Sequence, residues 1–286
     1  MCIRDSCVKI AIFPNTSKTE SLQIALGVVK FLQERDVVVF AEKEDAEYLS
    51  IPSISTVNLS EIDFLISMGG DGSILHLVHR YSQSRAAILG INLGHLGFMT
   101  DIPISDLYPS LEDFLHKKYT IEHRIIIDGI GPKGEKAFAV NDFVLHRGKN
   151  STLIEVAISV DGRHLNTFEA DGIILATPNG STAYSLAAGG PIVGPPLPAF
   201  VITPISPHTI SNRPIVLTST HTISMKYLSS MSSIDVIADG IEQFPLSTDE
   251  SVHFRCSGNT FKLVTLSKKD YFATLREKLN WTGKLR

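Results

Sequence analysis

The sequence contains few cysteines and lacks both a long apolar run and a concentration of basic residues. Three of its 286 residues are cysteine, and none of Cys2, Cys7 and Cys256 stands in a CxxC or Cys/His spacing typical of metal sites. This odd, widely separated set argues against a disulfide framework and is typical of a reducing compartment, so we expect a cytoplasmic protein. No apolar run reaches about 18 residues, so we expect no membrane association.

The charge balance is mildly acidic, with a formal net charge of -4. Because no stripe or tail of lysine and arginine is present, we expect no nucleic-acid partner. A protein of this charge that binds anionic nucleotides must concentrate positive potential locally, through backbone N–H groups, helix N-termini or a metal ion. The polar leader from Met1 to Cys7 is expected to be unstructured or an extraneous extension.

Short apolar runs alternate with amphipathic stretches in the first part of the chain. The first run, 8–13, is rich in β-branched residues, as in buried strands, and the stretches between the runs have apolar residues at helical spacing. This alternation predicts an α/β domain with a parallel, doubly wound sheet over residues 8–118. The expected strands are 8–13, 37–40, 62–68 and 86–91, and the expected helices are 19–33, 73–81 and 107–116.

Beyond Tyr119 the pattern changes to period-two alternation, with turn signals such as Asp161-Gly162 between the runs. This predicts an all-β, sandwich-like domain over residues 119–266. A helical stretch interrupts it at 181–188, and a further short helix is expected at 269–279 within a C-terminal segment, 267–286. The expected strands are 120–127, 137–145, 153–160, 173–176, 199–204 and 215–217.

The first motif, Gly69-Gly70-Asp71-Gly72-Ser73, joins a predicted buried strand to a predicted helix. In an open parallel sheet, ligands bind at the carboxyl ends of strands. Glycines let the backbone approach a phosphate, and the free N–H groups of the helix attract an anion. Asp71 can accept a hydroxyl proton or hold Mg²⁺, unless it is only a local cap of the helix. Similar turns occur in phosphofructokinases and lipid kinases, so this motif does not name the substrate.

The second motif is TPNGSTAYSLAAGGP, from Thr177 to Pro191. Its Ser181-Thr182 pair suits the start of a helix. Hydroxyl and N–H groups there can bind ribose or phosphate oxygens, and Tyr184 can pack on a flat ring. A capped helix that follows a strand explains the same composition, so both interpretations stay open on composition alone.

At these two motifs the chain resembles the NAD kinase family. The GGDGS turn, followed at a distance by ADGIILATPNGSTAYSLAAGGP, is distinctive of that family. The segments Val140–Gly148 (VNDFVLHRG) and Pro204–Thr209 (PISPHT) are also similar, and so is the pair Arg213-Pro214. The resemblance extends from about Val8 to Trp281. It implies transfer of a phosphoryl group from ATP, or another donor, to the 2′-hydroxyl of the adenosine ribose of NAD, which makes NADP.

The resemblance also implies an architecture and a set of partners. The family has a Rossmann-like α/β domain followed by a β-sandwich domain that binds NAD, α+β overall, and its C-terminal helix returns to the first domain. The small-molecule partners would be NAD and ATP, with a divalent metal ion such as Mg²⁺ accompanying ATP. A homodimer or homotetramer is the implied assembly.

The family's functional residues match specific positions of this sequence. By resemblance, Asp71 is the general base that faces the ribose 2′-hydroxyl, and Gly72 lies against the dinucleotide. Asn141 and Asp142 would bind the adenosine ribose hydroxyls, and Asp171 would contact the nicotinamide side. The residues expected to line the adenine and ribose pocket are Thr182, Ala183, Tyr184, Ser185, Leu186 and Ala187.

Several positions need separate comment. His76, in the helix after the first motif, is expected either beside a phosphate or as a solvent-exposed helix histidine. Asp142 stands where many relatives have Glu, which keeps the carboxylate but shortens its reach. Glu169 stands where several relatives have Arg, so no cationic contact to the pyrophosphate is expected there. Ile241 replaces a Gln of some relatives and Thr152 lies at a variably basic position, so neither is given a polar role.

Two other classes of protein share parts of this pattern. A lipid or sugar kinase has the GGDG turn, but a lipid kinase would lack the pocket of residues 177–191. A sugar kinase would need a basic cluster that the sequence lacks. A non-catalytic dinucleotide sensor would keep the pocket but has no need of Asp71. The sequence therefore favours an NAD kinase over both alternatives.

Overall fold

The computed structural model describes residues 7–15, 20–94, 96–100, 102–209, 211–230, 232–281 and 283. Apart from Cys7, which is an exposed free thiol, the polar leader lies outside the described residues. The contacts within the chain divide it into two compact units. Unit 1 comprises residues 1–122 and 262–286, and unit 2 comprises residues 123–261.

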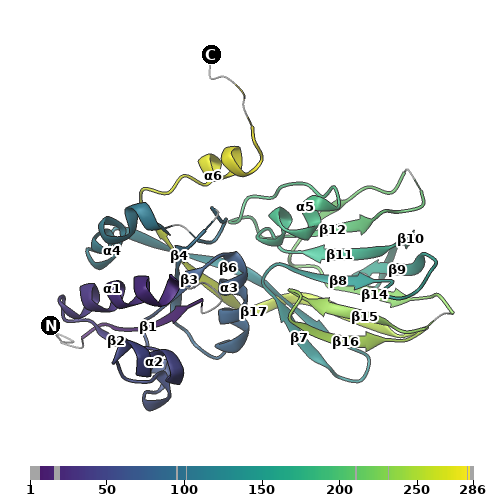
Figure 1. The fold of residues 1–286 in the computed structure, drawn as a ribbon. Coiled ribbons are helices and arrows are strands. Elements are labelled where there is room, and N and C mark those ends of the chain that lie inside the picture. Colours follow the sequence, from purple (N-terminus) through teal and green to yellow (C-terminus); the bar gives the residue numbers. More distant parts are fainter. Residues whose placement is uncertain are drawn as a thin grey trace. The chain divides into compact units, whose positions relative to one another are not determined.

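Unit 1 is built on a parallel sheet (Figure 1). Across the sheet, its strands are the C-terminal part of β17 (Ser251–Leu266), β4 (Ala87–Asn92), β3 (Phe64–Gly69), β1 (Lys9–Pro14) and β2 (Val38–Phe40), and the short β5 (Ile102–Pro103) lies beside β4. The central strands β3 and β4 are almost fully buried, as expected for a parallel sheet whose two faces are both covered.

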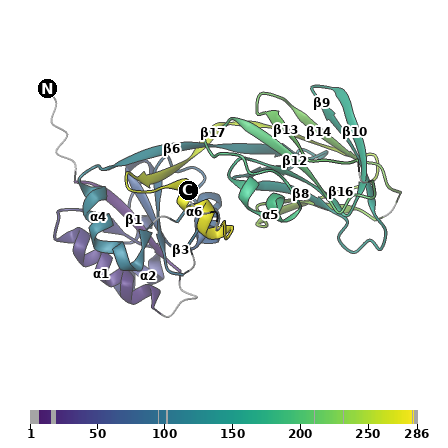
Figure 2. The same ribbon diagram turned by 90° about the horizontal axis from the view of Figure 1, so that it is seen from above.

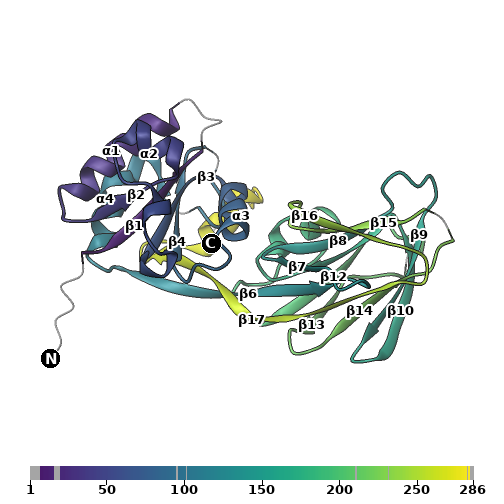
Figure 3. The same cartoon turned by 90° about the horizontal axis from the view of Figure 1, so that it is seen from below.

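Helices cover this sheet on both faces. One apolar cluster joins the sheet to α1 (Ser21–Gln33), α2 (Lys43–Leu49) and α4 (Leu107–Leu115), while α3 (Asp71–Arg80) packs on the other side of β3 and β4 (Figure 3). The C-terminal helix α6 (Tyr271–Lys278) also belongs to unit 1. Helix α2 is not among the predicted elements, because its short sequence KEDAEYL buries only Ala46 and Leu49.

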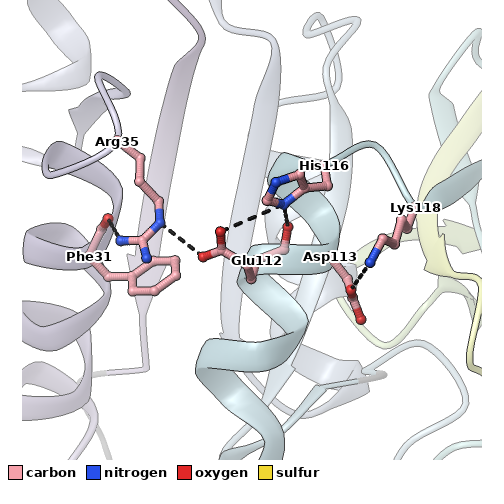
Figure 4. Close-up of polar contacts among 6 residues, drawn as sticks. All are labelled: Phe31, Arg35, Glu112, Asp113, His116 and Lys118. Atoms are coloured by element: carbon pink, nitrogen blue, oxygen red, sulfur yellow. Dashed lines mark hydrogen bonds and ion pairs between the residues drawn. The ribbon is translucent and has the colours of Figure 1, made fainter.

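Exposed polar contacts lie at the C-terminal ends of α1 and α4, at the surface of unit 1 (Figure 4). Arg35 donates from Nε to a carboxylate oxygen of Glu112 at 2.9 Å, and its guanidinium lies 3.6 Å from the centroid of the Phe31 ring. Lys118 forms an ion pair with Asp113 at 3.0 Å. Exposed pairs of this kind contribute about 0–1 kcal/mol each, so burial of the apolar helix faces is what holds these helices on the sheet.

Unit 2 consists of two packed sheets. The chain enters it along β6 (Tyr119–Ile130) and leaves it along β17 (Figure 2). One sheet contains β6, β7 (Lys136–Ala139), β9 (Ile154–Val160), β10 (Arg163–Ala170), β14 (Ile223–Tyr227) and the N-terminal part of β17. The other has the order β13 (Ile215–Thr218), β12 (Ala199–Ile205), β11 (Gly172–Ala176), β8 (Asp142–His146), β15 (Ile234–Ala238) and β16 (Glu242–Leu246).

The six-stranded sheet is buried on both faces in its centre. Ile173 and Leu175 of β11 belong to the core shared with the other sheet, whereas Ile174 and Ala176 belong to a second cluster on the outer face. The short helix α5 (Tyr184–Ala187) and the segment that follows it lie over this outer face (Figure 1). A strand covered on both faces has a continuous apolar sequence, which explains the run IILA in β11.

The predicted fold class is confirmed: an α/β unit is followed by a β-sheet unit. Two local predictions are wrong, and several strands were missed. The expected strand 137–145 is interrupted between β7 and β8, where a side chain from a distant turn takes up the backbone N–H groups. The expected helix 181–188 is a 3-10 turn (Gly180–Thr182) and α5, separated at Ala183, which has φ −104° and ψ −126°. Strands β10 and β14–β17 were not predicted, although β14 (ISMKY) and β15 (IDVIA) show the same period-two alternation as the predicted strands. Within the described residues, no helix combines the length and apolar character needed to cross a bilayer.

Candidate functional site

Asp71 is the first residue of α3, at the point where β3 ends. Gly70 is the N-cap of the helix and has an extended backbone. A Cβ atom on Gly69 would lie 2.2 Å from the hydroxyl oxygen of Ser73, so a glycine permits the abrupt change from strand to helix. Asp71 therefore lies at the positively polarised end of α3, which stabilises a carboxylate. Gly72 follows it as an exposed residue of the first helical turn.

Four hydrogen bonds hold the Asp71 carboxylate against the segment that follows β4. Oδ2 accepts the backbone N–H of Phe98 at 2.7 Å, and Oδ1 accepts those of Met99 and Thr100 at 3.0 and 3.2 Å and the Thr100 hydroxyl at 3.3 Å. A Cβ atom on Gly97 would lie 2.1 Å from Oδ1, so this close approach requires a glycine. We call this carboxylate with its three N–H donors the Asp71 anchor.

A lysine from the C-terminal segment lies beside the Asp71 anchor. The Lys269 ammonium donates to the carbonyl of Phe98 at 3.2 Å, so Phe98 is bound to Asp71 through its N–H and to Lys269 through its carbonyl. Burial lowers the pKa of Lys269 to about 8, and the negative charge of Asp71 opposes this shift. The Asp71 carboxylate thus lies near a half-buried cation, which sequence analysis missed because nothing in the local sequence distinguishes Lys269 from its neighbour Lys268.

A pocket of about 720 Å³ opens at the carboxyl ends of β1 and β3. These adjacent strands mark the point where the strand order reverses, because β2 lies on the far side of β1 and β4 on the far side of β3. Ligands bind at such points in open α/β sheets, and the volume is in the range of small-molecule sites. The pocket is lined in part by Asn15, Glu42, Asp45, Ser67, Ser73, His76 and Arg80. His76 is exposed and therefore accessible within the pocket.

In unit 2, Asn141 and Asp142 lie where β7 ends and β8 begins. The carboxylate of Asp239 accepts the backbone N–H groups of Val140, Asn141 and Asp142 at 2.7, 2.8 and 3.1 Å. We call this carboxylate with its three N–H donors the Asp239 anchor. Asp239 is not among the predicted site residues, and Ile241, two residues further on, was given no polar role. The Asp-Gly turn signal at this position was the available clue.

The surroundings of the Asp142 carboxyl group disfavour its ionised form. The residue is only 6% exposed. Burial, and then the negative charge of Asp239, raise the pKa of Asp142 to about 7. A carboxyl group with this pKa exchanges its proton near neutral pH, and pKa shifts of this kind are concentrated at functional sites.

The turn after β11 packs directly on Asn141. The Asn179 amide donates to the side-chain oxygen of Asn141 at 2.5 Å, and its own oxygen accepts a hydrogen bond from the buried Arg124. The N–H of Thr177 donates to the Asn141 carbonyl at 2.8 Å, and a Cβ atom on Gly180 would lie 2.1 Å from the same carbonyl oxygen. The structure therefore brings Asn141 together with the start of the second motif. Nothing in the sequence around Arg124 identifies it as a member of this group.

Residues 182–187 continue this motif with mixed roles. The Thr182 hydroxyl donates to the Asn179 carbonyl at 3.1 Å. The Ser185 hydroxyl is buried and shares a hydrogen bond with the Thr203 hydroxyl at 2.8 Å, so it fixes the segment to β12. Tyr184 is 42% exposed and presents its ring at the surface. Ala183 and Leu186 are half-buried, and Ala187 is exposed.

Asp171 is separated from this group. It precedes β11 and forms an ion pair with Arg147, whose Nε lies 2.6 Å from a carboxylate oxygen of Asp171. Because β11 pairs antiparallel with β8 along residues 172–176, Asp171 and Asp142 lie at opposite ends of the strand pair. The structure therefore does not bring Asp171 to the group formed by Asn141 and Asp142.

No group of three or more His, Cys, Asp or Glu side chains in the described part of the chain is arranged to hold a metal ion. The protein residues alone thus do not fit a resident metal centre. Mg²⁺ is commonly bound through one or two carboxylates together with the phosphates of a nucleotide. Because the described residues form no protein-only cage, a divalent ion would belong to the nucleotide substrate.

Comparisons with known protein families cover both units. A family model described as the ATP-NAD kinase N-terminal domain matches residues 10–119, and one described as the ATP-NAD kinase C-terminal domain matches residues 140–266. The NAD kinase of Protochlamydia amoebophila is 53% identical over 277 residues, which cover 97% of this chain and 99% of that protein. The NAD kinase of Geotalea daltonii is 35% identical and covers 96% and 98% of the two chains.

Solved structures share the whole fold. Yeast NADH kinase complexed with NADH superposes with a TM-score of 0.87 and 27% identity, covering 99% of this chain and 90% of the yeast chain. An NAD kinase from Archaeoglobus fulgidus, in complex with ATP, has a TM-score of 0.76 and 24% identity over 97% of this chain and 100% of that one, which is a likeness of fold. With a family model on each unit and a relative more than half identical along nearly the whole chain, the resemblance of the two motifs is confirmed, and this chain belongs to the NAD kinase family.

Proposed function

We propose that this protein transfers a phosphoryl group from ATP to the 2′-hydroxyl of the adenosine ribose of NAD and so makes NADP. The observation that carries the proposal is the placement of Asp71, at the start of α3 with its carboxylate fixed by four hydrogen bonds. Family membership supports the reaction, and the likeness to a yeast NADH kinase complexed with NADH supports a dinucleotide acceptor.

Asp71 is proposed as the general base. Among the described residues, its Oδ2 accepts only the bond from Phe98, and a carboxylate oxygen has two lone pairs, so Oδ2 retains one for a ribose hydroxyl. The pKa of that hydroxyl is far above 7, so the carboxylate orients it and takes its proton late in the transfer. Phosphoryl transfer passes through a loose transition state, which makes such positioning the main contribution of the protein.

The acceptor residues are proposed from the group around Asn141 in unit 2. Asn141 and Asp142 offer an amide and a carboxyl group to the adenosine ribose, and Tyr184 offers an exposed ring to a flat base. Residues 182–187 are proposed to lie against the adenine and ribose of the same NAD molecule. The buried Ser185 hydroxyl holds that segment against β12 through its hydrogen bond with Thr203.

The donor is proposed to occupy the pocket of unit 1. The helix start at Gly72 and the Ser73 hydroxyl offer donors to phosphate oxygens, and His76 lies within the same pocket. The acidic rim at Glu42 and Asp45 suits the hydroxyl groups of the donor ribose. The phosphates would then approach Asp71 from the start of α3.

Mg²⁺ is proposed to enter bound to ATP. When bound, it neutralises charge on the transferred phosphates. The protein supplies the N–H groups at the start of α3 and holds the acceptor hydroxyl. The contact of Asp171 with the nicotinamide side, the dimeric or tetrameric assembly and the cytoplasmic location stay predictions.

The proposed reaction is tested by incubating the full chain with NAD, ATP and Mg²⁺ and detecting NADP with an NADP-specific dehydrogenase. We expect NADP from the wild type and a loss of about 10²-fold or more in kcat for Asp71→Asn, the scale of a lost general base. Thermal unfolding of the variant checks that it is folded. A wild type that binds NAD but makes no NADP with any phosphoryl donor would instead be a dinucleotide sensor.

A further inference from the structure

Asp239 is held in an unusual backbone conformation by the turn between β15 and β16. Its φ is +51° and that of Gly240 is +69°, in the left-handed region that few residues other than Gly, Asn and Asp adopt. The N–H of Asp239 donates to the carbonyl of Asp142 at 2.9 Å, which extends the pairing of β15 with β8. The turn and this bond together direct the Asp239 carboxylate at the segment between β7 and β8.

In a regular sheet, carbonyl groups of a neighbouring strand would accept the backbone N–H groups of this segment. Here the Asp239 carboxylate accepts them instead. Oδ2 accepts one N–H and Oδ1 accepts two, so three consecutive N–H groups converge on one carboxylate. Asn141 is fixed on both sides, because Asp239 binds its N–H and Thr177 donates to its carbonyl. The side-chain oxygen of Asn141 then accepts a hydrogen bond from the Asn179 amide at 2.5 Å. The position of the Asn141 side chain therefore depends on a carboxylate 98 positions away.

We propose that Asp239 is a positioning residue for the acceptor dinucleotide, and that its carboxylate holds Asn141 and Asp142 in the arrangement that meets the adenosine ribose. The inference rests on the proposed function, which assigns these two residues to the ribose. Asp239 acts through their backbone and makes no contact with the reacting atoms in this proposal.

The charge of Asp239 also predicts a pH dependence of NAD binding, which a residue with a purely structural role would not produce. On one side of β8, β11 places the uncharged Ala176 opposite Asp142, and on the other side the turn after β15 contributes Asp239. Burial and this charge raise the pKa of Asp142 to about 7. An ionised Asp142 accepts hydrogen bonds from ribose hydroxyls better than a protonated one, so NAD binding strengthens as the pH rises through about 7. Removal of the Asp239 charge moves that transition to lower pH.

The chain contains a matched control in the turn between β9 and β10. Asp161 has φ +50° and is followed by Gly162 with φ +76°, as Asp239 is followed by a glycine in the same region. The Asp161 carboxylate accepts the N–H of Thr222 at 2.8 Å and lies 2.6 Å from His221. The two turns have the same Asp-Gly sequence and similar conformations, but the Asp161 turn binds a different segment.

The test compares Asp239→Asn with Asp161→Asn in the full chain, in steady-state assays with NAD and MgATP from pH 5.5 to 8.5. For Asp239→Asn we expect KM for NAD to rise roughly tenfold, because the N–H groups of residues 140–142 lose their charged acceptor. We expect kcat to change less than roughly threefold and KM for ATP to stay unchanged, because only the residues proposed to bind NAD are affected. The pH midpoint of kcat/KM for NAD shifts to lower pH. For Asp161→Asn both KM for NAD and the midpoint stay at their wild-type values.

Two results would overturn the inference: a folded Asp239→Asn with the wild-type KM for NAD and midpoint, or an equal rise in KM for both variants. If Asp239→Asn does not fold, Asp142→Asn gives the second measurement, because it removes the titrating group and must abolish the transition near pH 7 while Asp239 stays in place. Persistence of that transition also contradicts the inference. Failure of the proposed function is distinct, because the wild type itself then makes no NADP.

Discussion

Each unit contains an aspartate whose carboxylate accepts three consecutive backbone N–H groups from a distant part of the chain, yet the two have opposite neighbours. Asp71 accepts the N–H groups of residues 98–100 and lies near the ammonium of Lys269. Asp239 accepts those of residues 140–142 and lies near the carboxyl group of Asp142. The same backbone arrangement is thus combined with a cation in unit 1 and with a second acid in unit 2.

This difference gives the two anchors opposite responses to pH. In unit 2 the folded state raises the pKa of Asp142 to about 7, so stability is greatest below the unfolded pKa and is lost as the pH rises through about 7. In unit 1 the folded state lowers the pKa of Lys269 to about 8, so stability is gained as the pH rises from about 8 towards the unfolded value. Charge rather than hydrogen bonding therefore distinguishes the two regions.

The largest loss of stability is expected from Gly180→Ala, which displaces the Asn141 backbone beside the Asp239 anchor. The added Cβ atom would lie 2.1 Å from the Asn141 carbonyl oxygen and 2.5 Å from its carbon, and these are backbone atoms that cannot rotate away. We expect a loss of about 3 kcal/mol in the free energy of unfolding, measured in urea. Gly258→Ala is the control, because nothing lies within 4 Å of its added Cβ atom. Equal stability of the two variants would refute this assignment.

Asp142→Asn tests the acidic side of the comparison. Because wild-type stability falls as the pH rises from about 4 to about 7, the variant gains stability relative to the wild type over this range, by up to about 4 kcal/mol at pH 8. Urea unfolding at pH 4.5 and pH 8 measures the change. Asp235→Asn removes an exposed carboxylate from β15 and serves as the control for a change of charge. A difference between wild type and Asp142→Asn that does not vary with pH is the contrary result.

Gly97→Ala tests the Asp71 anchor by the same steric means. Here the added Cβ atom meets the ends of two side chains, at 2.1 Å from Asp71 Oδ1 and 2.3 Å from Thr100 Oγ1, which can move aside. We therefore expect a smaller loss of about 1–2 kcal/mol in unfolding free energy but a fall of roughly tenfold in kcat, since the displaced carboxylate is the proposed base. Gly194→Ala, whose nearest neighbour would be 4.0 Å away, should leave both unchanged.

Lys269→Met tests the cationic side and should have the smallest effect on stability, about 1 kcal/mol or less near neutral pH. Because the folded state lowers the pKa of Lys269, the wild type should gain stability relative to the variant as the pH rises from about 8 to about 10. The adjacent Lys268→Met is the control, since Lys268 is exposed and pairs with Asp106 at 2.5 Å. Parallel pH profiles for the two variants would show that Lys269 is not a buried cation.

The strand, turn and helix around Asp71 could be predicted from the sequence, because each is a local signal. A short apolar run marks β3, the glycines mark the turn, and apolar spacing marks α3. The group around Asn141 was predicted only through the resemblance of its segment to a family. Strand β17 was missed, because its sequence SVHFRCSGNTFKLVTL mixes exposed polar positions with buried ones along its course through both units.

The sequence by itself determined the two structural classes and the location of the GGDG turn, because apolar periodicity and glycine spacing act within a few residues of each other, and the resemblance of its two motifs indicated the family. It did not decide which aspartate holds which segment. Asp161-Gly162 and Asp239-Gly240 are the same dipeptide with similar backbone conformations, yet only the second meets Asn141. That choice arises when β15 pairs with β8, since a hydrogen bond between residues about a hundred positions apart depends on which strands become neighbours. Tertiary structure alone gave Asp71 a cationic neighbour and Asp239 an acidic one.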